Sequence, residues 1–216
     1  VMERAVQAIV DGQQRGGGFD YNYKKGARRD TSVAGWQVQA MKAAYLAGAE
    51  NEGLETAMEK ALDDMTAMQD MKSGRFGYST KKGSGTDAVT GAGVLCLQLL
   101  GRAEGDSARA GLLALKDTEC TWVGCKRLSP LYAYYYITQA KFHQGGSTWK
   151  SWNDQFAEKF VEHQNPDGSW PGIGRAKEGE KPREERHGAA YRTTMAALSL
   201  QVYYRFLPTY KPVAVE

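Results

Sequence analysis

Four stretches of the chain have the spacing of helices but carry almost no charge, and this limits the possible folds more than any other feature. The stretches are residues 30–49, 86–101, 131–140 and 193–204. The first contains one internal charge, Lys42, and the second contains only Asp87, near its start. A helix that is apolar all round has to be buried on every side. A simple four-helix bundle does not need four such helices.

Amphipathic helices alternate with these uncharged stretches. Residues 53–70 place apolar side chains on one stripe, and residues 147–164 place Trp149, Trp152, Phe156 and Phe160 at spacings of 3, 4 and 4 residues. Both segments carry charges on the remaining faces. The count of 27 Ala against 3 Ile also favours helix over strand. The sequence therefore predicts an all-α fold of stacked helical hairpins, as an open solenoid or a closed double ring.

A turn with glycine and an aromatic residue ends each amphipathic helix. The marker aromatics Phe19, Phe76, Trp122 and Trp170 are spaced 57, 46 and 48 residues apart. Repeat periods near 40–50 residues indicate stacked units of two helices. The chain is expected to hold about four hairpins, the first of them incomplete. We expect the indole of Trp170 to lie against a neighbouring hairpin.

The heptad Gln164-Asn165-Pro166-Asp167-Gly168-Ser169-Trp170 resembles the glutamine–tryptophan repeat of squalene–hopene cyclases and related terpene cyclases. Weaker copies run from Gln13 and Gln14 to Phe19 and from Gln69 to Tyr78. The helix starts at 30–33 and 86–89 resemble those of the same superfamily, which includes the β subunits of protein prenyltransferases. Residues 134–208 look like a bacterial branch of "prenyltransferase and squalene oxidase repeat" proteins.

The resemblance implies an α/α toroid, a ring with inner apolar helices and outer amphipathic helices. That ring usually has six hairpins, so about four hairpins imply an open arc or a fragment of the ring. We expect residues 1–216 to form a single domain of this type, which can be part of a longer chain. Further repeats or another chain are the protein partners expected to pack against it.

The catalytic motifs of the resembled families do not carry over. Squalene–hopene cyclases protonate an alkene with the middle Asp of Asp-x-Asp-Asp-Thr, and the matching stretch here is Arg28-Arg29-Asp30-Thr31. Neighbouring arginines favour the charged form of a carboxyl, which is the opposite of what a proton donor needs. Protein prenyltransferases hold zinc with Asp, Cys and His, and Arg192 occupies the place of the His. We therefore expect no metal and no cofactor.

Each candidate site residue has a structural reading beside a functional one. Asp30 and Asp87 are either acids at the starts of their helices, where they stabilise unpaired N–H groups, or catalytic acids. The run of tyrosines at 132–136, with Phe142, either packs in the core or lines a cation–π pocket. Residues 175–187 are either a solvated loop or an active-site flap. The weak catalytic candidates are Asp30, Asp87, His187 and Tyr191, and the ligand-binding candidates are Arg28, Arg29, Tyr132, Tyr135 and Arg192.

Parallel inner helices would bring their N-termini, and most of these candidates, to one rim. The arginines there either bind an anionic group such as a diphosphate, or pair with Asp30, Asp87, Glu184 and Glu185. Three function classes stay open: a binding or structural repeat module, an enzyme that acts on an isoprenoid, and a carbohydrate-active enzyme that uses His187, Tyr191 and Arg192. The expected ligand is small and either apolar or anionic.

Charge and cysteine content exclude other classes. A net charge of +3, from 28 basic and 25 acidic residues, does not favour nucleic-acid binding. The longest uncharged run, Ala88–Gly101, has 14 residues, which is short of the roughly 18 that a membrane span needs. Cys120 and Cys125 are either unrelated thiols or a loop disulfide. We expect a soluble domain and leave its compartment open, because a leader or an anchor can lie outside these residues.

Overall fold

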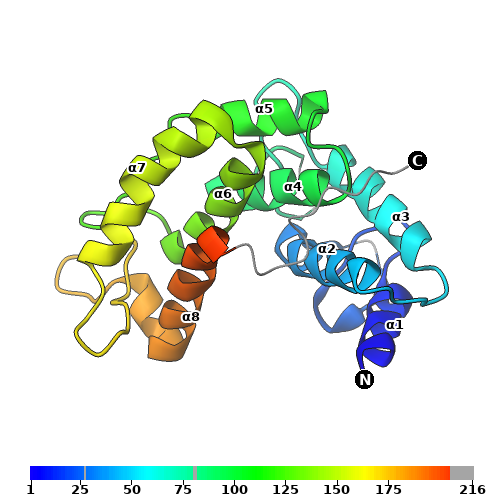
Figure 1. Cartoon of the computed structure of the whole chain (residues 1–216), viewed down its shortest axis with the longest axis horizontal. Helices are drawn as coiled ribbons and strands as arrows, with labels where there is room; N and C mark the ends of the chain where they lie inside the picture. Colours follow the sequence, from blue (N-terminus) through cyan, green and yellow to red (C-terminus); the bar gives the residue numbers. More distant parts are fainter. Residues whose placement is uncertain (27, 80–81, 205–216) are drawn as a thin grey trace. The chain divides into compact units, whose positions relative to one another are not determined.

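The computed structural model describes residues 1–26, 28–79 and 82–204 (Figure 1). The described residues form α-helices and three short 3-10 helices, without a β-strand, so the predicted all-α class is confirmed. The α-helices are α1 (Met2–Gly12), α2 (Thr31–Leu46), α3 (Leu54–Ala67), α4 (Asp87–Leu99), α5 (Asp106–Ala114), α6 (Pro130–Gln144), α7 (Gly146–Glu162) and α8 (Gly188–Leu200). The 3-10 helices are η1 (Tyr21–Tyr23), η2 (Arg183–His187) and η3 (Gln201–Tyr204). The uncharged stretch at 193–204 is covered by α8 and η3, and the last residues of the segment 134–208 lie outside the described residues.

The described chain falls into two compact units, residues 1–115 and 116–204, which we call the N-terminal and C-terminal units. In the N-terminal unit the uncharged helices α2 and α4 pack against each other. The amphipathic helices form a second layer, in which α1 and α3 contact α2, and α3 and α5 contact α4. This is the expected pairing of an inner and an outer layer. The single domain over 1–216 and the toroid or arc stay predictions.

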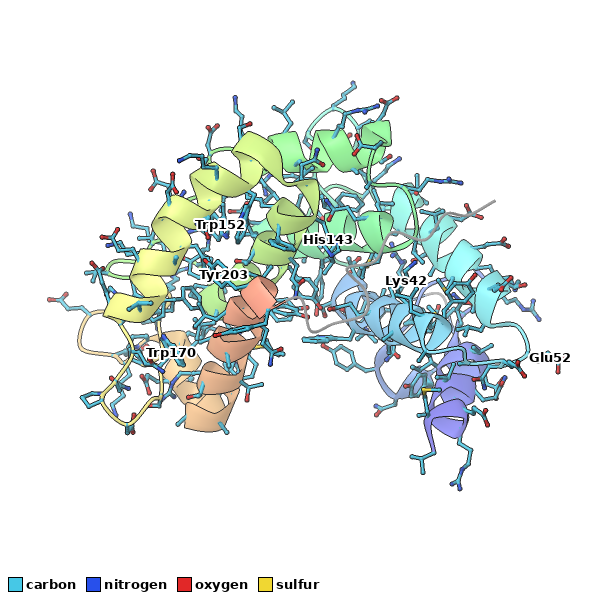
Figure 2. All side chains as sticks on the ribbon, viewed as in Figure 1. Lys42, Glu52, His143, Trp152, Trp170 and Tyr203 are labelled. Carbon is cyan, nitrogen blue, oxygen red and sulfur yellow. The ribbon has the colours of Figure 1, made fainter. Side chains whose placement is uncertain are left out.

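In the C-terminal unit, α6 packs against both α7 and α8 (Figure 1). The indole N–H of Trp152 on α7 donates to the hydroxyl of Thr138 on α6 at 2.9 Å and joins the two helices (Figure 2). Three of the four stripe residues on α7, Trp152, Phe156 and Phe160, are fully buried as their spacing predicted, and Trp149 is half-buried. The rings of Trp152 and Phe156 are stacked with 6.1 Å between their centres, and the rings of Phe156 and Phe160 meet at a tilt with 4.6 Å between their centres.

The burial of the two layers agrees with the charge pattern. Met41, Leu97 and Ile137 on the inner helices are at most 1% exposed. The acidic outer residues Glu59, Asp63, Asp154 and Glu158 are exposed. Leu198 on α8 departs from the expectation and is only half-buried. The reason is that α8 packs mainly against α6 and the short helices η2 and η3, whereas α4 is covered by α2, α3 and α5.

No helix among the described residues combines the length and the apolar character that crossing a membrane requires.

Candidate functional site

Three turns that follow outer helices share one hydrogen-bonding pattern, and we call them the glutamine turns. They are residues 13–19, 69–76 and 164–170. In each, a glutamine amide donates to the carbonyl of a glycine: Gln13 to Gly17 at 2.9 Å, Gln69 to Gly74 at 3.0 Å, and Gln164 to Gly168 at 2.9 Å. The three glycines have φ angles of 90°, 70° and 85°, in the left-handed region that favours glycine. Three of the turns that the sequence predicted as repeats therefore share the same local structure.

The first two glutamine turns also hold the next outer helix. The Gln13 amide donates to the carbonyl of Ala57 in α3 at 2.7 Å, and the Gln69 amide donates to the carbonyl of Ser107 in α5 at 2.8 Å. Both glutamines are buried. A methyl group added at Gly74 would overlap the carbonyl oxygen of Ala110, so the absence of a side chain lets the turn lie directly on the backbone of α5.

The turn that follows α5 contains the marker Trp122 but no glutamine. Here the backbone N–H of Cys120 donates to the side-chain carbonyl of Gln155 on α7 at 2.8 Å. The indole of Trp122 stacks on His163, with 4.7 Å between ring centres. This turn is thus held against α7, the next outer helix, by a side-chain hydrogen bond and a ring contact in place of a glutamine of its own.

The indole of Trp170 is buried and its N–H donates to the carbonyl of Phe160 at 2.7 Å. Phe160 belongs to α7, the helix that comes just before this turn. The bond is therefore made within one hairpin, and the expected contact of the indole with a neighbouring hairpin stays a prediction.

Asp30 is the N-cap of α2, which confirms its structural reading. One carboxylate oxygen accepts the backbone N–H groups of Ser32 at 2.9 Å and Val33 at 3.2 Å. The other oxygen lies 3.1 Å from the guanidinium of Arg28. Arg28 also pairs with Asp20. The structure therefore brings Arg28 and Asp30 together as an ion pair at the start of the helix.

Arg29 forms a largely buried ion pair with Asp64 on α3, and the side chains are only 10% and 11% exposed. Burial raises the pKa of Asp64 to about 6, although the charge of Arg29 opposes this change. Arg29 thus links the start of an inner helix to an outer helix. Asp87, in the first turn of α4, pairs with Arg75 at 2.9 Å.

In the C-terminal unit, Glu184 is the central polar residue. Its side chain is fully buried, and one oxygen accepts the backbone N–H of Leu131 at 2.9 Å, in the first turn of α6. Glu184 therefore caps α6 from the short helix η2, while the N-cap residue Ser129 makes no side-chain cap bond. Burial raises the pKa of Glu184 to about 7.

Two of the candidates at the start of α8, Tyr191 and Arg192, interact electrostatically with this carboxyl. Burial raises the pKa of Tyr191 to about 12, and the charge of Glu184 adds to the effect. The ring of His187 lies 5.0 Å from the ring of Tyr191. Arg192 pairs with Glu185 at 3.0 Å and donates to the carbonyl of Trp170 at 3.2 Å. The structure thus brings His187, Tyr191 and Arg192 to one end of α8.

The tyrosine candidates Tyr132 and Tyr135 lie on α6. Tyr135 is buried, Tyr132 is partly exposed, and both pack edge-on against Tyr136 with 4.9 Å between ring centres. These contacts match core packing.

Sequence reasoning missed the partners Asp20 and Asp64 and the capping role of Glu184. Glu184 lies in the charged segment 175–187, whose composition indicates solvent exposure, so no local signal marks it as buried. Asp64 occurs among other acidic residues of α3. Its position near the stripe of buried residues, three after Ala61 and one before Met65, is the signal that could have identified it.

Among the described residues, no group of three or more His, Cys, Asp or Glu side chains is placed to hold a metal ion. Cys96, Cys120 and Cys125 are buried free thiols, so the loop disulfide is not formed. Comparisons with protein-family models, with characterised proteins and with solved structures give no significant match.

Proposed function

We propose that this chain is a helical-hairpin repeat module, related in architecture to squalene cyclase and prenyltransferase repeats, that works as a binding or structural unit. The observation that carries the proposal is that the candidate polar side chains make hydrogen bonds and ion pairs to other parts of the fold. Asp30 and Glu184 cap helices, and the ligand-binding candidates Arg28, Arg29 and Arg192 each have a carboxylate partner. An arginine that already has a buried or hydrogen-bonded carboxylate partner offers less charge to an external anion.

The glutamine turns support the architectural part of the proposal. Two of them fix an outer helix to the next outer helix by the same pair of hydrogen bonds. This is the arrangement that a stack of hairpins needs, because each unit buries its face against its neighbour. We infer an open arc of such hairpins for the whole chain.

A direct test is to incubate the purified chain with squalene and with farnesyl diphosphate and to look for products by mass spectrometry. We expect both substrates to be recovered unchanged. Titration calorimetry with pyrophosphate completes the test, and we expect no saturable heat. Formation of a cyclised product from squalene, or release of pyrophosphate from farnesyl diphosphate, would overturn the proposal.

Glu184 favours a second candidate, an enzyme that acts on an isoprenoid. Alkene protonation needs a carboxyl that still holds its proton near neutral pH, and burial raises the pKa of Glu184 to about 7. One oxygen of Glu184 accepts from the first turn of α6, and the other oxygen is buried as well. If a product forms, the Glu184→Gln variant separates this candidate from others, because it should fold and lose the activity.

A further inference from the structure

The turn between α5 and α6 contains two of the three thiols of the chain. Cys120 and Cys125 are 5% and 6% exposed, and four residues separate them. Both are free thiols. The hydrogen bonds and ion pairs that carry the proposed function do not involve either sulfur. The turn therefore holds two buried, oxidisable groups that have no role in the account so far.

The hydroxyl of Tyr134 on α6 brings the two cysteines together. It donates to the carbonyl of Thr121 at 2.7 Å and accepts the backbone N–H of the same residue at 2.9 Å, so it lies beside the peptide bond that follows Cys120. The sulfur of Cys125 lies 3.9 Å from the same hydroxyl. Burial raises the pKa of Tyr134, and the charges of the Cys120 and Cys125 thiolates raise it further. Both thiols are therefore close to one buried polar atom.

Two cations act on Cys120. The guanidinium of Arg127 lies 5.8 Å from the ring centre of Tyr134. Burial raises the pKa of Cys120 to about 12, and the charges of Arg127 and Lys159 oppose this change. The thiolate is the form that attacks a disulfide, and a nearby cation stabilises it. Burial thus keeps the pair unreactive while the turn is closed, and the cations favour the thiolate once water reaches it.

The cover over Cys125 is thin. Its neighbours Gly124 and Lys126 are exposed, and a methyl group added at Gly124 would meet no described atom within 4 Å. Such a turn opens locally at a low free energy, without unfolding a helix. Cys96 differs, because it is 1% exposed in α4, which is buried at every residue from Ala88 to Leu99. A small reagent should therefore reach Cys125 first and leave Cys96 untouched.

We propose that Cys120 and Cys125 are a reversible oxidation site, which a small disulfide such as oxidised glutathione converts to an intramolecular disulfide. The Cys125 thiolate attacks one sulfur of glutathione disulfide, whose S–S bond breaks and releases one glutathione, which takes up the proton that Cys125 lost. The Cys120 thiolate then attacks the sulfur of Cys125 in the mixed disulfide and releases the second glutathione with the second proton. The chain loses two hydrogen atoms, and the glutathione disulfide is reduced to two thiols.

The new bond would join the two ends of the turn that is held against α7. The backbone N–H of Cys120 bonds to Gln155, and Trp122, between the two cysteines, stacks on His163. Oxidation would therefore fix the contact of this turn with the outer helix. The proposal goes beyond the repeat-module function and does not depend on it.

The test is to incubate the folded chain with oxidised glutathione, block the remaining thiols and map the unreduced peptides by mass spectrometry. The wild type should fall from three free thiols to one, release two glutathione molecules per chain and show a peptide that links Cys120 to Cys125. Dithiothreitol should restore all three thiols.

Matched variants separate the two steps. Cys96→Ala should form the disulfide as the wild type does. Cys120→Ser lacks the thiol that completes the reaction, so it should retain one glutathione on Cys125. Cys125→Ser lacks the thiol that attacks first, so it should stay largely unmodified. Melting curves show whether each variant is folded.

A wild-type chain that keeps its three thiols would overturn the proposal. So would glutathione that stays bound to the wild type without a linked pair, or a disulfide that includes Cys96 or joins two chains. The peptide map of the wild type decides the linkage alone, so a variant that fails to fold does not leave the proposal untested.

Discussion

The Glu184 carboxyl links the fold to pH, because it is fully buried and caps α6. Its pKa rises from the usual 4.5 to about 7 on folding. The folded state therefore binds the proton more tightly than the unfolded state between these two values. The stabilisation that the protonated carboxyl gives is complete below about pH 4.5 and is lost as the pH rises through 7.

We predict that the Glu184→Gln variant removes this loss. Relative to the wild type, its free energy of unfolding should rise by on the order of 3 kcal/mol from pH 4.5 to pH 7. Urea unfolding at several pH values measures it. Burial lowers the pKa of His143 to about 4, so in both proteins this residue makes the free energy of unfolding rise with pH, opposite to the effect of Glu184. The difference in free energy of unfolding between the variant and the wild type is therefore the quantity to compare. A difference that does not change with pH would contradict the prediction.

A second prediction at this scale concerns the buried pair of Arg29 and Asp64. Arg29→Met leaves an unpaired buried carboxylate and should lower the free energy of unfolding by about 3–5 kcal/mol. The double variant Arg29→Met with Asp64→Leu should recover most of this loss, since an apolar pair can replace a buried ion pair. Arg28→Met is the control: its side chain is 48% exposed, so its loss should be clearly smaller than that of Arg29→Met. An Arg29→Met protein as stable as the wild type would show that the pair does not support the fold.

At the scale of elements, the hydropathy pattern was sufficient to predict the helices, and it placed the inner residues Met41, Leu97 and Ile137 correctly. It failed for Leu198, because burial of a helix depends on which helices flank it and not on its own composition. It also could not predict that Glu184 caps α6, since a cap supplied from 53 residues away leaves no local pattern. The heptad at 164–170 predicted a turn, and the two weaker copies have the same hydrogen bond from the glutamine amide to a glycine carbonyl.

The turn glycines give a prediction that separates docked turns from the undocked one. Gly74→Ala combines a left-handed φ of 70° with overlap on the backbone of α5, whereas Gly168→Ala has only the strain of a φ of 85°. The strain alone costs about 1–2 kcal/mol. We expect Gly74→Ala to lose at least about 2 kcal/mol more than Gly168→Ala in thermal or urea unfolding. Equal losses would mean that the docking of the turn on α5 contributes nothing.

Trp170 fixes the third turn to α7 through its buried indole and the bond to the carbonyl of Phe160. Trp170→Ala should lower the free energy of unfolding by about 3–5 kcal/mol. Trp170→Phe keeps most of the ring and loses only the N–H donor, so it should cost about 1–2 kcal/mol. An unchanged melting curve for Trp170→Ala would remove the structural role assigned to this residue.

For the whole molecule, the proposal is that hairpins stack through the glutamine turns. Fold class followed from the sequence because helix periodicity and charge are local properties. The roles of the candidate residues did not, because a carboxylate partner such as Asp64 or Glu185 turns a predicted anion ligand into part of the scaffold. Such partners are set by packing between elements.

The most direct test of this account is the free energy of unfolding of three matched variants, Gln13→Ala, Gln69→Ala and Gln164→Ala, measured at a dilution where the chain is monomeric. The first two glutamines each hold a turn and the next outer helix, so each loss should be about 1–3 kcal/mol. Gln164 holds only its own exposed turn, so its loss should stay within about 0.5 kcal/mol. Equal losses at all three positions, or no loss at Gln13 and Gln69, would contradict the account.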